Sequence, residues 1–201
     1  MANRAYNVFA KWDQEEAAKA RRTMIVCVLA TDMDVHATLQ EELLRRKQRP
    51  FDFDSEVDKT LLGKCILHAA DIANPTRPFR TSAPISLMAI SEFQSQAQVE
   101  KAEGLPCTPY FVFTDFASKC RGEVGFAQFV ARPYFAALLD CLARTEVAVA
   151  RGFDPLSAID ANIEQWKLQM ANDDLRLNFV HNVCLRQMTQ ADIQKHRDIL
   201  L

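Results

Sequence analysis

Hydrophobic residues recur at three- and four-residue spacing along most of the chain, which is the pattern of helices that bury one face. Between residues 14 and 48 this pattern predicts one or two helices, with an apolar stripe at Val35, Leu39 and Leu43. Thr31 and Asp32 interrupt the segment and mark either a helix boundary or polar groups that face a cavity. A later helix carries Asp71, and Ser55 is its expected N-cap.

Prolines and glycines divide the rest of the chain into three further predicted helices. The first covers about residues 84–103 and ends at the glycine and prolines that follow. The second is predicted to open at residues 122–126, with a kink at Pro133, because proline lacks the N–H that a helix interior requires. Pro155 suits the first turn of the third helix. An amphipathic stretch over residues 175–201 closes the chain.

The composition agrees with a helical protein. Of 201 residues, 49% are hydrophobic and only 5 are glycine, which is below the ordinary frequency of about 7%. Because alternating β-branched runs are also few, the sequence predicts an all-α fold of one domain or two small ones. The net charge of −2 gives no electrostatic reason to expect nucleic acid or an anionic membrane as a partner.

The six cysteines lie far apart and form no C-x-x-C pair. They are therefore predicted to be reduced thiols, with Cys27, Cys65 and Cys141 acting as small buried hydrophobic residues. No apolar run reaches the roughly 18 residues that a membrane span requires. These features predict a cytoplasmic protein without a membrane span.

Asp71 is the candidate functional residue that the pattern itself singles out. It lies among small residues that allow helices to approach closely, namely Ala69, Ala70 and Ala73. An ionised carboxylate among packed helices is costly unless a cation or hydrogen-bond donors meet it. Asp71 is therefore a candidate metal ligand. The alternative is an exposed aspartate at a helix end, or one that a neighbouring donor satisfies.

Three separated motifs bear directly on function. They occupy residues 28–33 with His36 beyond, residues 68–75, and residues 123–126 with Pro133 beyond. In order and spacing they resemble the class I cyclic-nucleotide phosphodiesterase catalytic domain, and the resemblance extends over about residues 5–170. It implies a compact multi-helix bundle of the HD-domain/phosphodiesterase type that hydrolyses cAMP or cGMP. The implied metals are zinc and magnesium (or manganese), which polarise the phosphate and bind the attacking hydroxide.

The resemblance also implies roles for individual residues. Asp71 matches a ligand of the tighter metal, Asn74 and Pro75 match positions beside the nucleotide pocket, and Phe126 matches the residue that stacks against the base. The loop around Tyr110 is a weaker match to a segment that often covers the site. Three further pocket positions, each of which can equally belong to the core, are Phe93, Ile90 and Met33.

Glu123 stands where the family has a glutamine that reads the purine edge. Glutamine both donates and accepts hydrogen bonds, whereas an ionised carboxylate only accepts them. Glu123 therefore cannot donate to adenine N1 or guanine O6 unless it is protonated, but it can accept from guanine N1–H and the exocyclic amine. The hypothesis is that Glu123 weakens adenine recognition. The alternative is a helix N-terminal carboxylate that points to solvent.

Other parts of the family's site have no counterpart in the sequence. The family's histidine motifs supply the remaining metal ligands and the histidine that protonates the leaving oxygen, and they lie well upstream of Thr31. The histidines of this chain are His36, His68, His181 and His196, and none is followed by aspartate. Residues 1–201 are therefore interpreted as a partial catalytic domain, incomplete at the N-terminus, in which no catalytic residue is assigned.

An incomplete site changes what is expected of the isolated chain. One protein ligand is too few to hold zinc tightly, so the chain alone is predicted not to hydrolyse cyclic nucleotides. Loss of the upstream helices would expose apolar surface that favours association, such as a homodimer. The alternative function is a non-catalytic helical module that binds a partner or a nucleotide.

Overall fold

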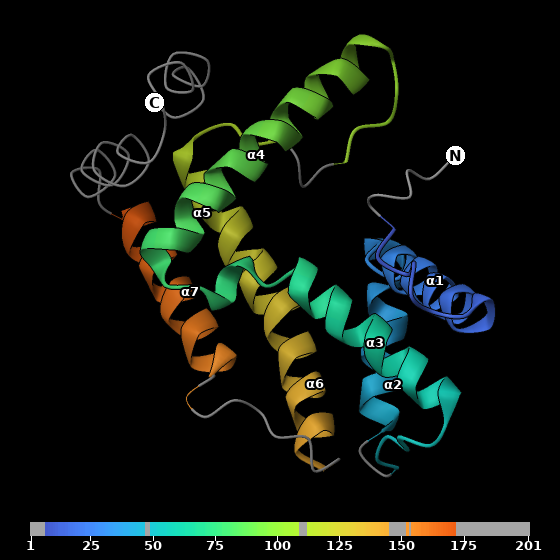
Figure 1. Ribbon diagram of the computed structural model, residues 1–201. Coiled ribbons are helices and arrows are strands. Elements are labelled where there is room, and N and C mark those ends of the chain that lie inside the picture. Colours follow the sequence, from blue (N-terminus) through green and yellow to red (C-terminus); the bar gives the residue numbers. More distant parts are fainter. Residues whose placement is uncertain (1–6, 47–48, 109–111, 145–151, 153, 172–201) are drawn as a thin grey trace. The chain divides into compact units, whose positions relative to one another are not determined.

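The computed structural model describes residues 7–46, 49–108, 112–144, 152 and 154–171, and every regular element within them is a helix (Figure 1). The predicted all-α fold is confirmed. The chain divides into two compact units, which are described separately below. The first comprises Met1–Asp71 and Ala137–Val149, and the second comprises Ile72–Ala136 and Ala150–Leu201.

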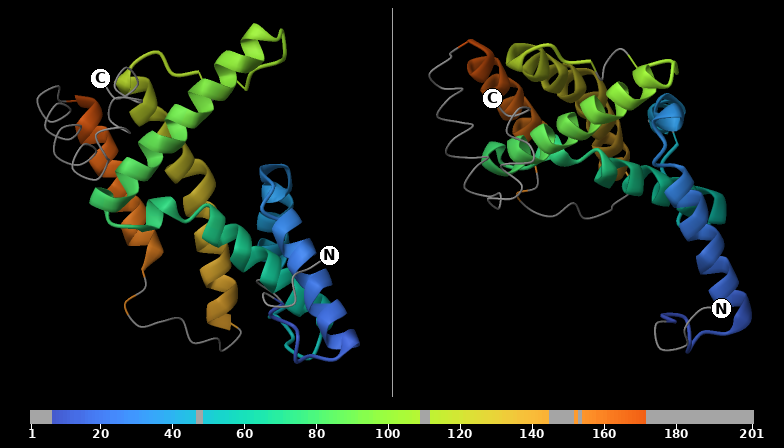
Figure 2. Two further views of the ribbon diagram at one scale, coloured as in Figure 1. Left: turned by 45° about the horizontal axis from the view of Figure 1, so that its top comes forward. Right: turned by 90° about the horizontal axis from the view of Figure 1, so that it is seen from above.

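The first unit contains the helices predicted over residues 14–48 and the helix that ends in Asp71. Its elements are α1 (Gln14–Leu29), a 3₁₀ turn (Met33–Val35), α2 (His36–Arg45), α3 (Glu56–Asp71) and the end of α6 (Arg132–Arg144). Helix α1 packs against α3 (Figure 2). Asp32 marks the expected boundary, because its carboxylate accepts from the Asp34 N–H at 3.0 Å. The Ser55 hydroxyl accepts from the Asp58 N–H at 3.3 Å, as expected of an N-cap.

A buried ion pair joins the end of α2 to the start of α3. The Arg46 guanidinium donates to both oxygens of Asp58, at 2.7 and 2.8 Å, and lies 5.1 Å above the centre of the Phe51 ring. The Asp52 N–H also donates to Asp58, at 3.0 Å. These donors hold the pKa of Asp58 below its ordinary value, with the Arg46 bonds as the main cause. The interaction closes the loop between the two helices.

The predicted buried thiols are found in this unit. Cys27, Cys65 and Cys141 are buried, and no disulfide is present among the described cysteines. The Cys141 thiol, on α6, lies 2.9 Å from the carbonyl oxygen of Leu43 and attaches the end of α6 to α2. The cysteines of this unit therefore serve packing.

The second unit is built around helices α4 and α7. Its elements are a 3₁₀ turn (Asn74–Thr76), α4 (Phe79–Ala102), α5 (Phe116–Gly125), a π-helical stretch (Phe126–Ala131), the first part of α6 (Arg132–Arg144) and α7 (Pro155–Ala171). Trp166 of α7 is buried and meets Phe79 edge to face, with ring centres 5.1 Å apart. Its buried apolar cluster consists of Ala83, Leu87, Ile90, Cys120 and Trp166.

Two predicted helix starts are wrong. Helix α4 begins at Phe79 rather than near residue 84, because the Pro78 carbonyl accepts the first helical bonds and Pro84 lies close enough to the start to be tolerated. Helix α5 begins at Phe116 rather than at residue 122. Asp115 and Ser118 form a capping box there, with the Ser118 N–H 2.6 Å from the Asp115 carboxylate.

Gly122 therefore lies inside a helix. A Cβ atom at this position would stand 2.8 Å from the Phe113 ring, so the glycine is needed for close approach and not for a helix start. The regular α-helix is then interrupted immediately before Pro133 by the π-helical stretch. Proline offers no N–H to the carbonyl four residues earlier, so the regular α-helical hydrogen bonding cannot continue unchanged at Pro133.

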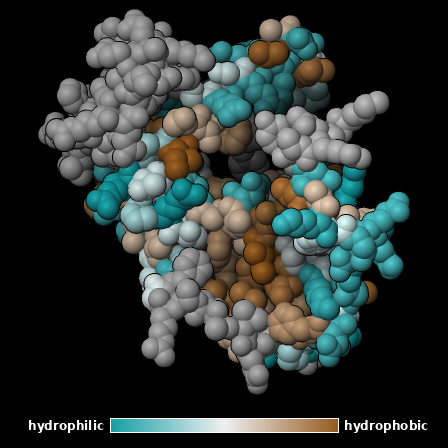
Figure 3. Space-filling model, in the orientation of Figure 1, coloured by the Kyte–Doolittle hydropathy of each residue, from teal (hydrophilic) through white to brown (hydrophobic). Residues whose placement is uncertain are grey.

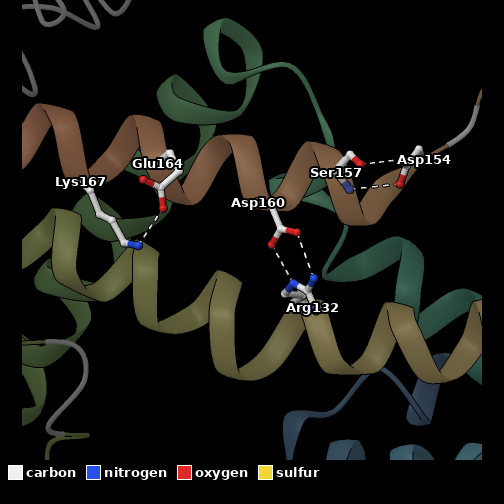
Figure 4. Close-up of polar contacts among 6 residues, drawn as sticks. All are labelled: Arg132, Asp154, Ser157, Asp160, Glu164 and Lys167. Carbon is white, nitrogen blue, oxygen red and sulfur yellow. Dashed lines mark hydrogen bonds and ion pairs between the residues drawn. The ribbon is translucent and has the colours of Figure 1, made fainter.

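Helix α7 begins at Pro155, the predicted first-turn position. Asp154 caps it by accepting from the Ser157 N–H and hydroxyl, at 3.1 and 2.6 Å (Figure 4). Arg132 of α6 makes a bidentate pair with Asp160 of α7, at 2.6 and 3.0 Å.

No helix in the described residues is long and apolar enough to cross a membrane. The stretch predicted over residues 175–201 lies outside the described residues, as does Tyr110.

Candidate functional site

A chain of hydrogen bonds in the second unit begins at Asn74. Its side-chain Nδ2 donates to the Ser82 carbonyl and to the Ser86 hydroxyl, each at 3.0 Å. Because a carbonyl can only accept, these bonds determine which side-chain atom is the nitrogen. The opposite atom, Asn74 Oδ1, is buried and has no hydrogen-bond partner in the described structure. A buried acceptor without a partner is costly, so it marks a position where a ligand donor would be favourable.

The chain of bonds continues from Ser86 to Glu123. The Ser86 hydroxyl, which accepts from Asn74, donates its single hydrogen to Glu123 Oε2. Burial raises the pKa of Glu123 to about 6, although the Ser86 bond opposes this rise. Near neutral pH the site therefore presents a poorly solvated carboxylate whose Oε2 is held by Ser86.

The proposed solvent-pointing alternative for Glu123 is wrong. Helix α5 begins seven residues earlier at Phe116, so Glu123 lies in its last turn, where the helix dipole does not favour a carboxylate. Glu123 is also only partly accessible and bonded to Ser86. The error came from placing the helix start at the glycines around residue 122.

The other predicted pocket residues occupy different environments. Phe126 follows Glu123 by three residues, at the start of the π-helical stretch, and is partly buried. Pro75 is buried, and Phe93 is partly buried on α4. Ile90 belongs to the buried apolar cluster, in agreement with its alternative as a core residue. Met33 is about half exposed and belongs to the first unit.

Three residues of this site were not predicted from the sequence. Ser82 and Ser86 lie four residues apart on α4 and hold the Asn74 amide, and a pair of small polar residues at that spacing on an apolar helix is a usable signal. Asn162 of α7 donates to the carbonyls of Pro75 and Arg77. No local pattern distinguishes it from other polar residues of a surface helix.

The predicted metal ligand, Asp71, is the last residue of α3 in the first unit and is exposed. His68, one turn earlier, is fully buried. Its Nδ1 lies 2.9 Å from the Ala30 carbonyl and its Nε2 lies 2.8 Å from His36 Nδ1. Since a carbonyl only accepts, His68 carries its proton on Nδ1 and accepts from His36 at Nε2.

The two histidines are thus engaged with each other. Burial and the neighbouring His68 lower the pKa of His36, which favours the neutral form of its imidazole. No cluster of three or more His, Cys, Asp or Glu side chains that could hold a metal occurs within the described ranges. The residues around Asp71 therefore do not by themselves fit a two-metal centre, which needs several protein ligands.

Comparison with known proteins identifies the family to which the chain is related. The family described as 3'5'-cyclic nucleotide phosphodiesterase matches residues 1–151. The Mus musculus protein named high affinity cGMP-specific 3',5'-cyclic phosphodiesterase 9A is 35% identical over 129 residues, which are 64% of this chain and 24% of the mouse protein. The Dictyostelium discoideum protein named 3',5'-cyclic-nucleotide phosphodiesterase regA is 25% identical over 209 residues, covering 98% of this chain and 25% of that protein.

Solved structures agree. The phosphodiesterase domain of the RhoPDE fusion protein from the choanoflagellate Salpingoeca rosetta is 27% identical, with a TM-score of 0.76. The match covers 85% of this chain and 52% of that one. The chain thus spans about a quarter of the length of the mouse and Dictyostelium relatives and about half of the solved domain.

The burial of Glu123 predicts a pH-dependent effect of Glu123→Gln on stability. The native carboxyl has a pKa of about 6 against an ordinary 4.5, so wild-type stability is complete below pH 4.5 and falls as the pH rises through 6. The shift corresponds to about 2 kcal/mol. Glutamine carries no charge at any pH. In urea unfolding at pH 7.5, Glu123→Gln should therefore be more stable than wild type by up to about 2 kcal/mol.

The difference should disappear at pH 4.5, where wild-type Glu123 is protonated. Glu164→Gln, on the exposed side of α7, is the matched control and should show no comparable pH-dependent gain. Equal stability of wild type and Glu123→Gln at pH 7.5 would contradict a buried carboxylate.

Proposed function

The chain belongs to the 3',5'-cyclic nucleotide phosphodiesterase family, and from that premise we propose that it supplies the base-recognising part of a domain that hydrolyses cGMP and cAMP to their 5'-monophosphates. The chain of bonds from Asn74 through Ser86 to Glu123 is the observation that carries this proposal. It contains two hydrogen-bond acceptors, Asn74 Oδ1 and the Glu123 carboxylate, at positions that the family resemblance assigns to the nucleotide pocket.

The two acceptors suit a purine edge. The unpartnered Asn74 Oδ1 would accept from an exocyclic amine of the base. Ionised Glu123 would accept from guanine N1–H and the amine beside it, whereas adenine offers no hydrogen at N1. Phe126 would stack on the base, and Pro75 and Phe93 would shape the apolar wall. Above a pH of about 6 this site should prefer guanine, and the mouse relative named cGMP-specific supports the same preference.

For the complete domain we propose zinc together with magnesium or manganese, with Asp71 as one ligand. Such metals polarise a phosphate and lower the pKa of bound water. His36 and His68 bond to each other and are poorly disposed to join Asp71. Since only two other histidines occur in the sequence and neither matches the family's motifs, further ligands would come from polypeptide beyond these 201 residues. We also propose a cytoplasmic location, supported by the absence of a disulfide among the described cysteines.

The second candidate function is a non-catalytic helical module that binds nucleotide or a protein partner. The bonding of His68 to His36 and to the Ala30 carbonyl favours it, because these groups satisfy one another without a metal. A purine pocket built within the second unit does not require the metal ligands in order to bind a base.

Exposed apolar residues in the first unit support association of two copies of the chain. Val28 is 60% exposed and Leu29 is 68% exposed at the end of α1, and Ile66 and Leu67 are exposed on α3. Figure 3 shows hydrophobic surface over α3. We propose that this apolar surface, defined by these four residues, forms a homodimer contact in the isolated chain.

Exchange of the purine-reading carboxylate should change nucleotide preference. At pH 7.5 the wild-type chain should bind cGMP more tightly than cAMP, and Glu123→Gln should reduce that preference by about tenfold because the amide can also donate to adenine. Titration calorimetry with both nucleotides, at pH 7.5 and 5.5, measures the effect. The wild-type preference should shrink at pH 5.5, where Glu123 is protonated. Glu92→Gln, exposed on α4, is the control, and unchanged affinities for both nucleotides would remove any purine-reading role from Glu123.

The purified chain should release no 5'-monophosphate from cGMP or cAMP when zinc and magnesium are added. The reason is that Asp71 lacks the additional protein ligands that a tightly bound metal requires. Product chromatography and metal analysis of the dialysed protein test this, with a complete phosphodiesterase domain as the positive control. Binding without hydrolysis fits both candidate functions, whereas hydrolysis at a rate above that of the metals alone would show that the account of the metal site is wrong.

Leu29→Glu should weaken self-association. A charge on the apolar surface would have to be desolvated when two copies meet. Sedimentation velocity over a concentration series should show the wild type passing from monomer to dimer as the concentration rises, whereas the variant stays monomeric. Gln14→Glu, at the exposed start of α1, introduces the same charge away from this surface and should behave as wild type. Identical sedimentation of Leu29→Glu and wild type would exclude this contact.

A further inference from the structure

Asn162 is a buried polar residue on α7 that neither the sequence motifs nor the proposed function uses. Its side chain is 3% exposed. The Nδ2 atom donates to the Pro75 carbonyl at 2.6 Å and to the Arg77 carbonyl at 2.8 Å. Both hydrogens of the amide are therefore directed at the backbone that surrounds one short turn. The family match ends at residue 151, so Asn162 lies beyond it.

That turn is the one that begins with Asn74. Within it, the Thr76 N–H donates to the Ala73 carbonyl at 2.9 Å and the Arg77 N–H donates to the Asn74 carbonyl at 3.2 Å. These local bonds shape the turn, and the two bonds from Asn162 attach it to α7. The Asn74 side chain is held separately by α4, through Ser82 and Ser86. The position of Asn74 Oδ1 thus depends on two anchors that lie on different helices.

Helix α7 is well suited to act as the anchor of the backbone. Asp160, which precedes Asn162 by two residues, pairs with Arg132 of α6 (Figure 4). Trp166, one turn after Asn162, is buried against Phe79 at the start of α4. The helix is therefore tied to its neighbours on both sides of the amide.

We propose that Asn162 is a positioning residue for purine recognition, which acts by holding the Asn74–Thr76 turn so that Asn74 Oδ1 stays directed at the base. This inference rests on the proposed function. An amide is the side chain that the position requires, because two carbonyl oxygens need two donors. Alanine removes both bonds and leaves the carbonyls of Pro75 and Arg77 without these donors, so the turn is expected to shift. A small displacement of the acceptor is enough to weaken a directional hydrogen bond to the ligand.

A double-mutant cycle tests this role. In calorimetric titration of the whole 201-residue chain with cGMP at pH 7.5, Asn162→Ala should raise the dissociation constant by about tenfold, the effect of losing one well-placed hydrogen bond. In an Asn74→Ala background the same substitution should change it by less than about twofold, because its target is already absent. A purely structural role would give the same factor in both backgrounds.

Controls separate this result from general loss of folding. Gln165→Ala, exposed on the same helix, should leave the dissociation constant unchanged in both backgrounds. Circular dichroism confirms that each variant is folded, and Asn162→Ser, which keeps one donor, replaces Asn162→Ala in the cycle if the alanine variant unfolds. Equal effects of the substitution with and without Asn74 overturn the inference while the proposed function stands. A wild-type chain that binds no cyclic nucleotide overturns the proposed function and this inference with it.

Discussion

The site in the second unit depends on the side-chain amide of Asn74, whose orientation is fixed by its hydrogen-bond partners. Asn74 must present its nitrogen to the Ser82 carbonyl, and its oxygen is consequently directed to a buried position without a donor. Everything else in the site follows from this orientation. Ser86 accepts from Asn74 and can donate only onward, so Glu123 receives its hydrogen. The direction of the hydrogen bonds is set by a backbone carbonyl, which does not titrate.

The same arrangement makes ionisation of the Glu123 carboxyl unfavourable. A single hydroxyl donor stabilises the ionised form less than water does, and burial therefore outweighs the hydrogen bond in setting the pKa of Glu123. Ionisation of Glu123 near neutral pH therefore lowers the stability of the folded protein. A ligand with two adjacent hydrogens on one edge would return some of that energy, which supports the proposal that this unit recognises the base.

Much of the fold was predictable, because helical periodicity, caps and prolines are local signals. Ser55, Asp32 and Pro155 acted as expected. The wrong start of α5 has a physical cause: Gly122 serves a contact with Phe113, and glycine in the sequence does not reveal whether it bends the chain or admits a neighbour. Ser86 joins the motif residues Asn74 and Glu123, and their roles in nucleotide binding stay a prediction. The hydrogen bonds of Asn162 join residues that are 85 and 87 positions apart in the sequence, and the His36–His68 bond joins residues 32 positions apart. No local sequence pattern encodes such pairings.

The π-helical stretch at Phe126–Ala131 has a consequence for how this segment tolerates change. A π turn contains more residues than an α turn, so it changes the direction in which all later side chains of the helix point. One residue of an α-helix corresponds to about 100° of rotation about the helix axis. Deleting a single residue there could restore a regular α-helix, but it would carry Arg132 round the axis and away from Asp160. The π-helical stretch thus sets the rotation of α6, which carries Arg132, relative to α5, which carries Glu123. In this segment the number of residues is as much a constraint as their identity.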